Sequence, residues 1–126
     1  MELLYEKESY ILRGIWFDIF NEFGPGHKES VYCNTFEQEL IIKKIPYTRE
    51  PQIHLYHKNG KVIGNYRPDF IAWDKIIIEF KSTAFLMPVF HKQILYYLKA
   101  SDYKLGFLVN FGSDKIQIIR RILTNQ

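Results

Sequence analysis

The sequence predicts an α/β fold of the α+β kind, with a central mixed sheet of about four to five strands flanked by helices. Three observations lead to this prediction. Apolar residues recur at helical spacing over 6–44, the pattern changes to strand-like alternation after residue 52, and a helix beginning near Pro88 separates two apolar strands. A strand, a helix and a strand in that order favour one crossover connection, so parallel and antiparallel neighbours would share one sheet.

Length and composition indicate a globular protein. The chain has 126 residues, the size of one ordinary domain, so we expect 1–126 to form a single domain. Hydrophobic residues make up 47% and charged residues 25%, and the 17% aromatic share supplies core volume. The net charge of +3 permits nucleic-acid binding but does not argue for it.

The same properties exclude some classes of protein. Cys33 is the single cysteine, which rules out an internal disulfide and a thiolate-rich metal site. No apolar run approaches the roughly 20 residues that cross a bilayer. The N-terminal MELLYEKESY lacks a signal-peptide profile. We therefore expect a soluble, cytoplasmic protein with no membrane partner.

The first two expected elements are helices over 6–22 and 29–44. In the first, apolar residues recur three and four apart, and Gly24-Pro25 marks its end. In the second, Tyr32, Phe36 and Leu40 repeat every four residues, and Pro46 follows its end.

The next elements are strands over 52–58 and 61–73. Between them stands Asn59-Gly60, which predicts a type I′ turn with positive φ at both central positions. Pro68 lacks an N–H group, so we expect a bulge or an unpaired edge within the second strand.

A turn over 73–75 leads into a third strand over 75–82. A helix then runs from Pro88, at its first turn, to about Ala100. The apolar segment 104–110 predicts a strand that is covered on both faces, and a last strand over 115–122 follows the turn Gly-Ser-Asp.

Three charges interrupt the apolar stretch RPDFIAWDKIIIEFKS (67–82). A turn centred on Asp74 would place Asp69 directly across from Glu79, with Cβ atoms about 4.5–5.5 Å apart. Lys81 lies on the same face, two residues beyond Glu79. A shift of one residue in register would send the two acids to opposite faces.

Two carboxylates placed this close repel each other unless a positive charge lies between them. Mg²⁺, or Mn²⁺ in its place, prefers oxygen ligands and usually takes one or two carboxylates. Lys81 would then stabilise developing charge or hold an attacking water. The alternative is that all three charges serve solubility on an exposed face. Ile77 argues against it, because it shares that face.

The pattern also resembles a known family. Pro68-Asp69 followed by Glu79-Phe80-Lys81 is similar to the signature of the PD-(D/E)XK nuclease superfamily. GHKESVY (26–32) resembles the Gly-x-x-Glu-x-x-Tyr element that names the GxxExxY family within it. Gln93 and Tyr97 resemble a Gln-x-x-x-Tyr element of the superfamily's RecB-like branches, and GFLVNFG (106–112) and the late Arg-Ile also look similar. The resemblance covers residues 6–122.

This resemblance implies a restriction-endonuclease-like core and a Mg²⁺-dependent nuclease. Asp69 and Glu79 would bind the metal, Glu29 would complete the metal site, and Lys81 would be the catalytic lysine. From the residues alone, Glu29 has another explanation, because the helix macrodipole favours a carboxylate near a helix start.

The resemblance also implies that Gln93 lies near the scissile phosphate and that Tyr97 supports it. Taken alone, Tyr97 is explained as a core aromatic. Gln93 is harder to explain in that way, because a buried amide needs partners. Lys28, Lys92 and Lys99 are candidate phosphate contacts, although each is also explained as a solvated charge.

The sequence therefore predicts a metal-dependent phosphodiesterase acting on nucleic acid, with DNA favoured over RNA. The alternative is a non-catalytic nucleic-acid- or protein-binding module that keeps the nuclease fold. A homo-oligomer is a further option, because apolar residues cover much of the circumference of the first helix.

Overall fold

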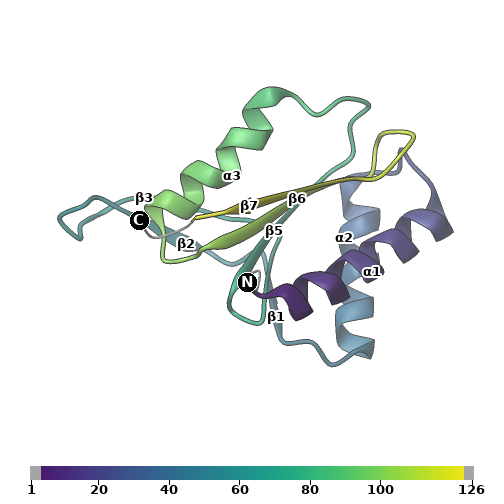
Figure 1. The fold of residues 1–126 in the computed structure, drawn as a ribbon, viewed down its shortest axis with the longest axis horizontal. Coiled ribbons are helices and arrows are strands. Elements are labelled where there is room, and N and C mark those ends of the chain that lie inside the picture. The colour runs from purple at the N-terminus through teal and green to yellow at the C-terminus, as the bar shows by residue number, and fades with distance from the viewer. Residues whose placement is uncertain (1–3, 124–126) are drawn as a thin grey trace.

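The computed structural model describes residues 4–123 of the chain (Figure 1). Its helices are α1 (Glu6–Phe23), α2 (Glu29–Ile42) and α3 (Pro88–Ala100). Its strands are β1 (Tyr47–Arg49), β2 (Ile53–Tyr56), β3 (Val62–Tyr66), β4 (Phe70–Ala72), β5 (Ile76–Lys81), β6 (Leu105–Asn110) and β7 (Gln117–Ile122).

The central sheet has five strands in the order β1-β4-β5-β6-β7. Strands β5 and β6 are parallel, and α3 connects them, whereas the other neighbouring pairs are antiparallel. Helices α1 and α2 lie on one side of this sheet and α3 on the other (Figure 1). The predicted mixed α+β architecture is confirmed.

The long strand predicted over 61–73 is in fact two strands. Residues before Pro68 form β3, which pairs with β2 in a separate two-stranded sheet, and residues after it form β4 of the central sheet. Pro68 cannot donate to a strand ladder, which explains the break at this position. Strand β1, which the sequence pattern did not reveal, pairs with β4.

The turn at Asn59-Gly60 also differs from the prediction. Gly60 has a φ of 89°, but Asn59 does not have a positive φ. The Gly60 N–H donates to the His57 carbonyl over 2.8 Å, so Lys58 and Asn59 are the central residues of the turn. A turn followed by a left-handed glycine joins β2 to β3, one residue longer than the predicted type I′ loop.

The helix ends follow local chemistry. Helix α1 stops at Gly24, which has a φ of 70° and donates its N–H to the Phe20 carbonyl. Helix α2 ends at Ile42, two residues earlier than predicted, and Lys44 then adopts a left-handed φ of 56°. Left-handed backbone ends a helix because it turns the chain away from the helical path.

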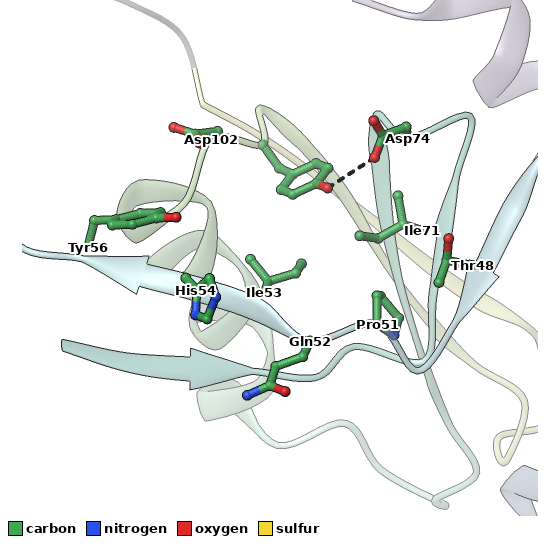
Figure 2. Close-up of a pocket in the computed structure, with 10 residues that line it drawn as sticks. Thr48, Pro51, Gln52, Ile53, His54, Tyr56, Ile71, Asp74 and Asp102 are labelled. Atoms are coloured by element: carbon green, nitrogen blue, oxygen red, sulfur yellow. Dashed lines mark hydrogen bonds between the residues drawn. The ribbon is translucent and has the colours of Figure 1, made fainter. Parts of the chain in front are cut away.

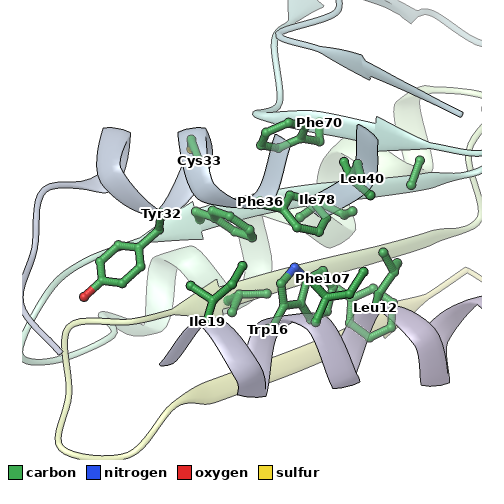
Figure 3. Packing of buried hydrophobic residues seen from close by; sticks show 14 of the residues in the cluster. Leu12, Trp16, Ile19, Tyr32, Cys33, Phe36, Leu40, Phe70, Ile78 and Phe107 are labelled. Carbon is green, nitrogen blue, oxygen red and sulfur yellow. The ribbon is translucent and has the colours of Figure 1, made fainter. Parts of the chain in front are cut away.

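The two sides of the sheet have separate cores. The larger one packs α1 and α2 against the sheet around aromatic rings, among them Trp16, Phe36 and Phe107 (Figure 3). The smaller one lies under α3 and the β2–β3 hairpin and includes Tyr66 and Ile77.

Alternation along β5 distributes its side chains between these cores. Ile76, Ile78 and Phe80 enter the larger core, and Ile77 enters the smaller one. Glu79 and Lys81 share the face of Ile77, because side chains alternate along a strand. The two charges therefore face α3.

Candidate active site

The β4–β5 hairpin sets the geometry of the two acids. Phe70 pairs with Ile78 and Ala72 with Ile76, so the turn is centred as the sequence predicts. One step beyond this ladder, the Asp69 N–H donates to Glu79 Oε1 over 3.1 Å. The predicted neighbour relationship of the two carboxylates is confirmed.

A backbone N–H group holds each acid, Asp69 directly before β4 and Glu79 within β5. Asp69 Oδ2 accepts a hydrogen bond of 2.7 Å from the Phe80 N–H, and Glu79 Oε1 accepts the bond from Asp69. A carboxylate fixed in this way has few side-chain rotamers available. Each acid also keeps one oxygen that makes none of these bonds.

The electrostatics favour a cation between the acids. Burial, and then the neighbouring charge of Asp69, raise the pKa of Glu79 to about 7. Burial also raises the pKa of Asp69, although the hydrogen bond from Phe80 and the charge of Lys81 counteract it. A pair of poorly solvated carboxylates with raised pKa values is stabilised in its charged form by a nearby positive charge.

Lys81 is the positive group on this face. Its charge lowers the pKa values of Asp69, Glu79 and Glu29, which indicates that it lies near all three. Its Nζ lies 4.4 Å from the centroid of the Phe90 ring at the start of α3. Within residues 4–123 it forms no salt bridge. The amine therefore lies beside the acids without neutralising either of them directly.

The GHKESVY segment acts as a structural clasp at the start of α2. The Tyr32 hydroxyl donates to the Gly24 carbonyl over 2.6 Å and accepts from the His27 N–H over 3.1 Å. Its ring stacks on Phe111 with centroids 4.3 Å apart. The Ser82 hydroxyl, directly after β5, donates to the His27 carbonyl. These contacts attach the start of α2 to the end of β5.

Glu29 is the first residue of α2, and the clasp brings it toward the acids. Much of the side chain is exposed, yet partial burial of the carboxyl group raises its pKa. Lys81 lowers this pKa and Asp69 raises it, so both charges lie within electrostatic range of Glu29.

One side of helix α3 faces the site. Phe90 lies under the Lys81 amine, and Tyr97 stacks on Tyr66 with ring centroids 3.7 Å apart. Gln93 stands between them, three residues after Phe90 and four before Tyr97, so it shares their side of the helix. Gln93 is exposed, and no hydrogen bond joins it to Asp69 or Glu79 among the described residues.

Tyr66 is the member of this group that sequence reasoning missed. It lies at the end of β3 with 8% of its surface exposed, and its hydroxyl and the Glu79 carboxylate affect each other's pKa. The position of the β2–β3 hairpin brings Tyr66 to the site. The sequence pattern shows it only as one more aromatic residue of a strand.

Family comparison agrees with this geometry. A model of the PD-(D/E)XK nuclease superfamily matches residues 6–122, which is most of the chain. The chain belongs to the PD-(D/E)XK nuclease superfamily. No curated protein and no solved structure matches it in the corresponding comparisons. Membership in the superfamily supports a nuclease and implies a nucleic-acid substrate.

Nucleases of this superfamily generally use divalent metals. Asp69 and Glu79 fit such an ion as donors, because each is an oxygen ligand with a free oxygen and the nearby charge of Lys81 leaves both pKa values raised. Within residues 4–123, however, no group of three His, Cys, Asp or Glu side chains is arranged to hold a metal ion. The role of Glu29 as a third ligand therefore stays a proposal.

The GFLVNFG segment stabilises the strand ends beside this nuclease site. Asn110 is fully buried, and its side chain accepts the N–H groups of Thr83 and Gly112 and donates to the Thr83 carbonyl. At Gly106, an added Cβ would lie 2.8 Å from Ile94 Cδ1, so glycine permits α3 to pack closely on β6. These motif residues have structural roles.

The three predicted nucleic-acid contacts are exposed lysines. Lys28 is the residue directly before α2 and adjoins Glu29, Lys92 adjoins Gln93 on α3, and Lys99 lies in the last turn of α3. No described residue forms a salt bridge with them. Lys28 and Lys92 are thus next in sequence to predicted site residues, whereas Lys99 is two residues beyond Tyr97.

A pocket of about 260 Å³ lies at the other end of β4 and β5 (Figure 2). Its lining includes Asp74, Asp102 and Tyr103, and the Tyr103 hydroxyl donates to Asp74 Oδ1 over 3.3 Å. None of the predicted site residues lines it.

Among residues 4–123, no helix is both long and apolar enough to cross a membrane.

Proposed function

We propose that this protein is a metal-dependent nuclease that hydrolyses phosphodiester bonds in DNA and belongs to the GxxExxY branch of its superfamily. The observation that carries the proposal is the hydrogen-bonded Asp69–Glu79 pair, which is poorly solvated and lies on the same face as Lys81. The GHKESVY clasp supports the assignment to the branch, because it gives that motif a physical role in placing Glu29.

Asp69 and Glu79 would hold Mg²⁺ or Mn²⁺, with Glu29 as a further ligand. When bound, the ion would supply Lewis-acid charge and lower the pKa of a water. As an ammonium group, Lys81 would position the attacking water and stabilise the charge that develops on the phosphate, whereas as a neutral amine it would take a proton from that water. The water oxygen bonds to phosphorus, the bond from phosphorus to one sugar oxygen breaks, the attacking water loses a proton, and the leaving sugar oxygen gains one.

Helix α3 and the exposed lysines would bind the substrate. Gln93 donates from its amide to the phosphate near the scissile bond, and Tyr97 supports it from the next turn. Lys28, Lys92 and Lys99 contact flanking phosphates, which gives affinity without sequence information.

The test is a cleavage assay with the whole chain, in Mg²⁺, in Mn²⁺ and in EDTA. Substrates are single-stranded, duplex and branched DNA, with matching RNA to decide between the two nucleic acids. We expect metal-dependent cleavage of DNA and a loss of at least about 100-fold in Glu79→Gln and Lys81→Met.

The matched controls are Glu39→Gln and Lys43→Met. These two residues form a partly exposed ion pair of 3.8 Å at the C-terminal end of α2, so the variants change the same charges away from the site. Both should cleave like the wild type. Equal cleavage by wild type, Glu79→Gln and Lys81→Met would overturn the proposal.

The alternative is a module that binds nucleic acid or protein without catalysis. It is favoured by one observation, namely that no three-ligand metal group forms among residues 4–123. DNA binding that EDTA leaves unchanged, with no cleavage of any substrate, would support this alternative.

Self-association is a separate proposal. The outer side of α1 exposes Tyr10 at 79% and Phe17 at 46%, an apolar area that a second copy would cover. Analytical ultracentrifugation tests it, and a pure monomer at high concentration would contradict it.

A further inference from the structure

The Tyr66 hydroxyl is an unsatisfied polar group next to the proposed metal site. Only 8% of the residue is exposed, and the hydroxyl has no hydrogen-bond partner among residues 4–123. Burying an unpaired hydroxyl costs about 1–3 kcal/mol. A chain that keeps this group in place of phenylalanine therefore carries a cost that the isolated fold does not explain.

The surroundings fix where this hydroxyl can go. The Tyr66 ring stacks on Tyr97 of α3, with centroids 3.7 Å apart and planes 11° apart. Tyr66 also pairs with Ile53 across the hairpin and packs in one cluster with Ile77 and Ile94. These contacts from the β2–β3 hairpin, the central sheet and α3 pack the ring closely and limit the positions that its hydroxyl can take.

The hydroxyl lies beside the Glu79 carboxylate. Burial and the charge of Glu79 both raise the pKa of Tyr66, so the phenol keeps its proton at physiological pH and remains a donor. Glu79 accepts a hydrogen bond from Asp69 on Oε1, and its carboxylate retains further lone pairs. The donor and the acceptor are therefore close enough to affect each other's pKa, yet within residues 4–123 no hydrogen bond joins them.

We propose that Tyr66 is a positioning residue, whose hydroxyl donates a hydrogen bond to the Glu79 carboxylate when that carboxylate binds a divalent cation. This inference rests on the proposed function. The bond would fix the orientation of Glu79 and satisfy the hydroxyl at the same time. Hydrogen bonds to ligating carboxylates from such outer partners typically change metal affinity by about 10–100-fold when removed.

The inference predicts two opposite effects of Tyr66→Phe. The ring and its stacking on Tyr97 remain, so the metal-free protein should be as stable as the wild type or more stable, because an unpaired buried hydroxyl is gone. Affinity for the cation should fall by about 10–100-fold. A residue with a merely structural role would not weaken metal binding while leaving the metal-free fold intact.

The experiment is a titration of the whole chain with Mn²⁺ alone. Binding is measured in two ways, by isothermal titration calorimetry and by the electron paramagnetic resonance signal of free Mn²⁺. Thermal unfolding in EDTA is measured on the same samples. The control is Tyr103→Phe, which removes the hydroxyl that contacts Asp74 in the turn of the β4–β5 hairpin. This control should bind Mn²⁺ like the wild type.

The outcomes are distinguishable from those of the proposed function. If the wild type binds Mn²⁺ and Tyr66→Phe binds it within about twofold, the positioning role is overturned and the nuclease proposal stands. If Tyr66→Phe loses as much free energy of unfolding in EDTA as it loses free energy of Mn²⁺ binding, the hydroxyl is structural and the inference is wrong. A wild type that binds no Mn²⁺ overturns both proposals.

Discussion

The backbone of Asp69 binds the side chain of Glu79, and the side chain of Asp69 binds the backbone of the residue after Glu79. The first bond is 3.1 Å and the second, to the Phe80 N–H, is 2.7 Å. This reciprocal arrangement holds two carboxylates side by side despite their repulsion. Both bonds lie within the chain, so the fold itself sets the positions of the two carboxylates.

The repulsion should appear as a pH-dependent stability of the metal-free protein. The pKa of Glu79 is about 7 in the folded state, against a reference of 4.5, so the folded chain binds more protons than the unfolded chain between these values. Stability is therefore greatest below pH 4.5 as far as Glu79 is concerned, and falls as pH rises through 7. The loss of stability that Glu79 contributes over this pH range is at most about 3 kcal/mol.

Urea unfolding in EDTA from pH 5 to 8 measures this effect. Glu79→Gln should lose most of the slope, because its side chain does not titrate, whereas Glu39→Gln in the last turn of α2 should keep it. Asp69 and Glu29 also have raised pKa values, so they contribute to the slope with the same sign. A slope that is the same in wild type and Glu79→Gln would contradict the prediction.

Cys33 should be almost unreactive in the folded protein. Burial raises the pKa of its thiol to about 12, and the charge of Asp69 adds to this effect. The thiolate is the reactive form, so at pH 8 its fraction should be about 10³-fold lower than in an unfolded chain. Reaction with a chromogenic disulfide, in buffer and in guanidinium, measures the ratio. A native rate close to the unfolded rate would show that α2 opens readily.

Gly112→Ala should strongly destabilise the protein. An added Cβ would lie 2.1 Å from the Thr83 nitrogen, and backbone atoms cannot move aside cheaply. We expect a loss of about 3 kcal/mol or more, measured by urea unfolding. The control is Gly14→Ala within α1, where an added Cβ meets nothing, and alanine should stabilise by about 0.5–1 kcal/mol. Two variants of equal stability would contradict the close approach at Gly112.

DNA binding should depend on salt through the exposed lysines. Replacing Lys28 or Lys92 by alanine should weaken binding uniformly across sequences and reduce the salt slope by about 1 each. Affinity of the Glu79→Gln protein for DNA, measured at several salt concentrations, gives these slopes. Lys43→Ala, away from the site, should leave the slope unchanged. Equal slopes in all variants would remove these lysines from the interface.

Much of the candidate site could be predicted because its geometry is local. The two strands that carry Asp69 and Glu79 are joined by a tight turn, in which Trp73 and Asp74 both have positive φ, near 52° and 53°. Once that turn is placed, side-chain alternation fixes which residues share a face. The neighbouring acids and Lys81 follow from the sequence for this reason.

Other features required long-range contacts. Strand β1 has only three residues and no distinct pattern, and it exists because it pairs with β4. At Pro68 the sequence predicts a bulge or an unpaired edge, yet the break there separates β3 into a different sheet. Periodicity cannot show this, because both halves alternate as strands do.

The sequence by itself determined the mixed fold, the register at Asp74 and the acids on one face, because turn chemistry and alternation act over a few residues. Only the tertiary structure decided what surrounds them. The stacking of Tyr66 on Tyr97 and the approach of Glu29 bring together elements far apart in the chain. Their physical cause is the packing of α2, α3 and the hairpin on the sheet, which no local pattern encodes.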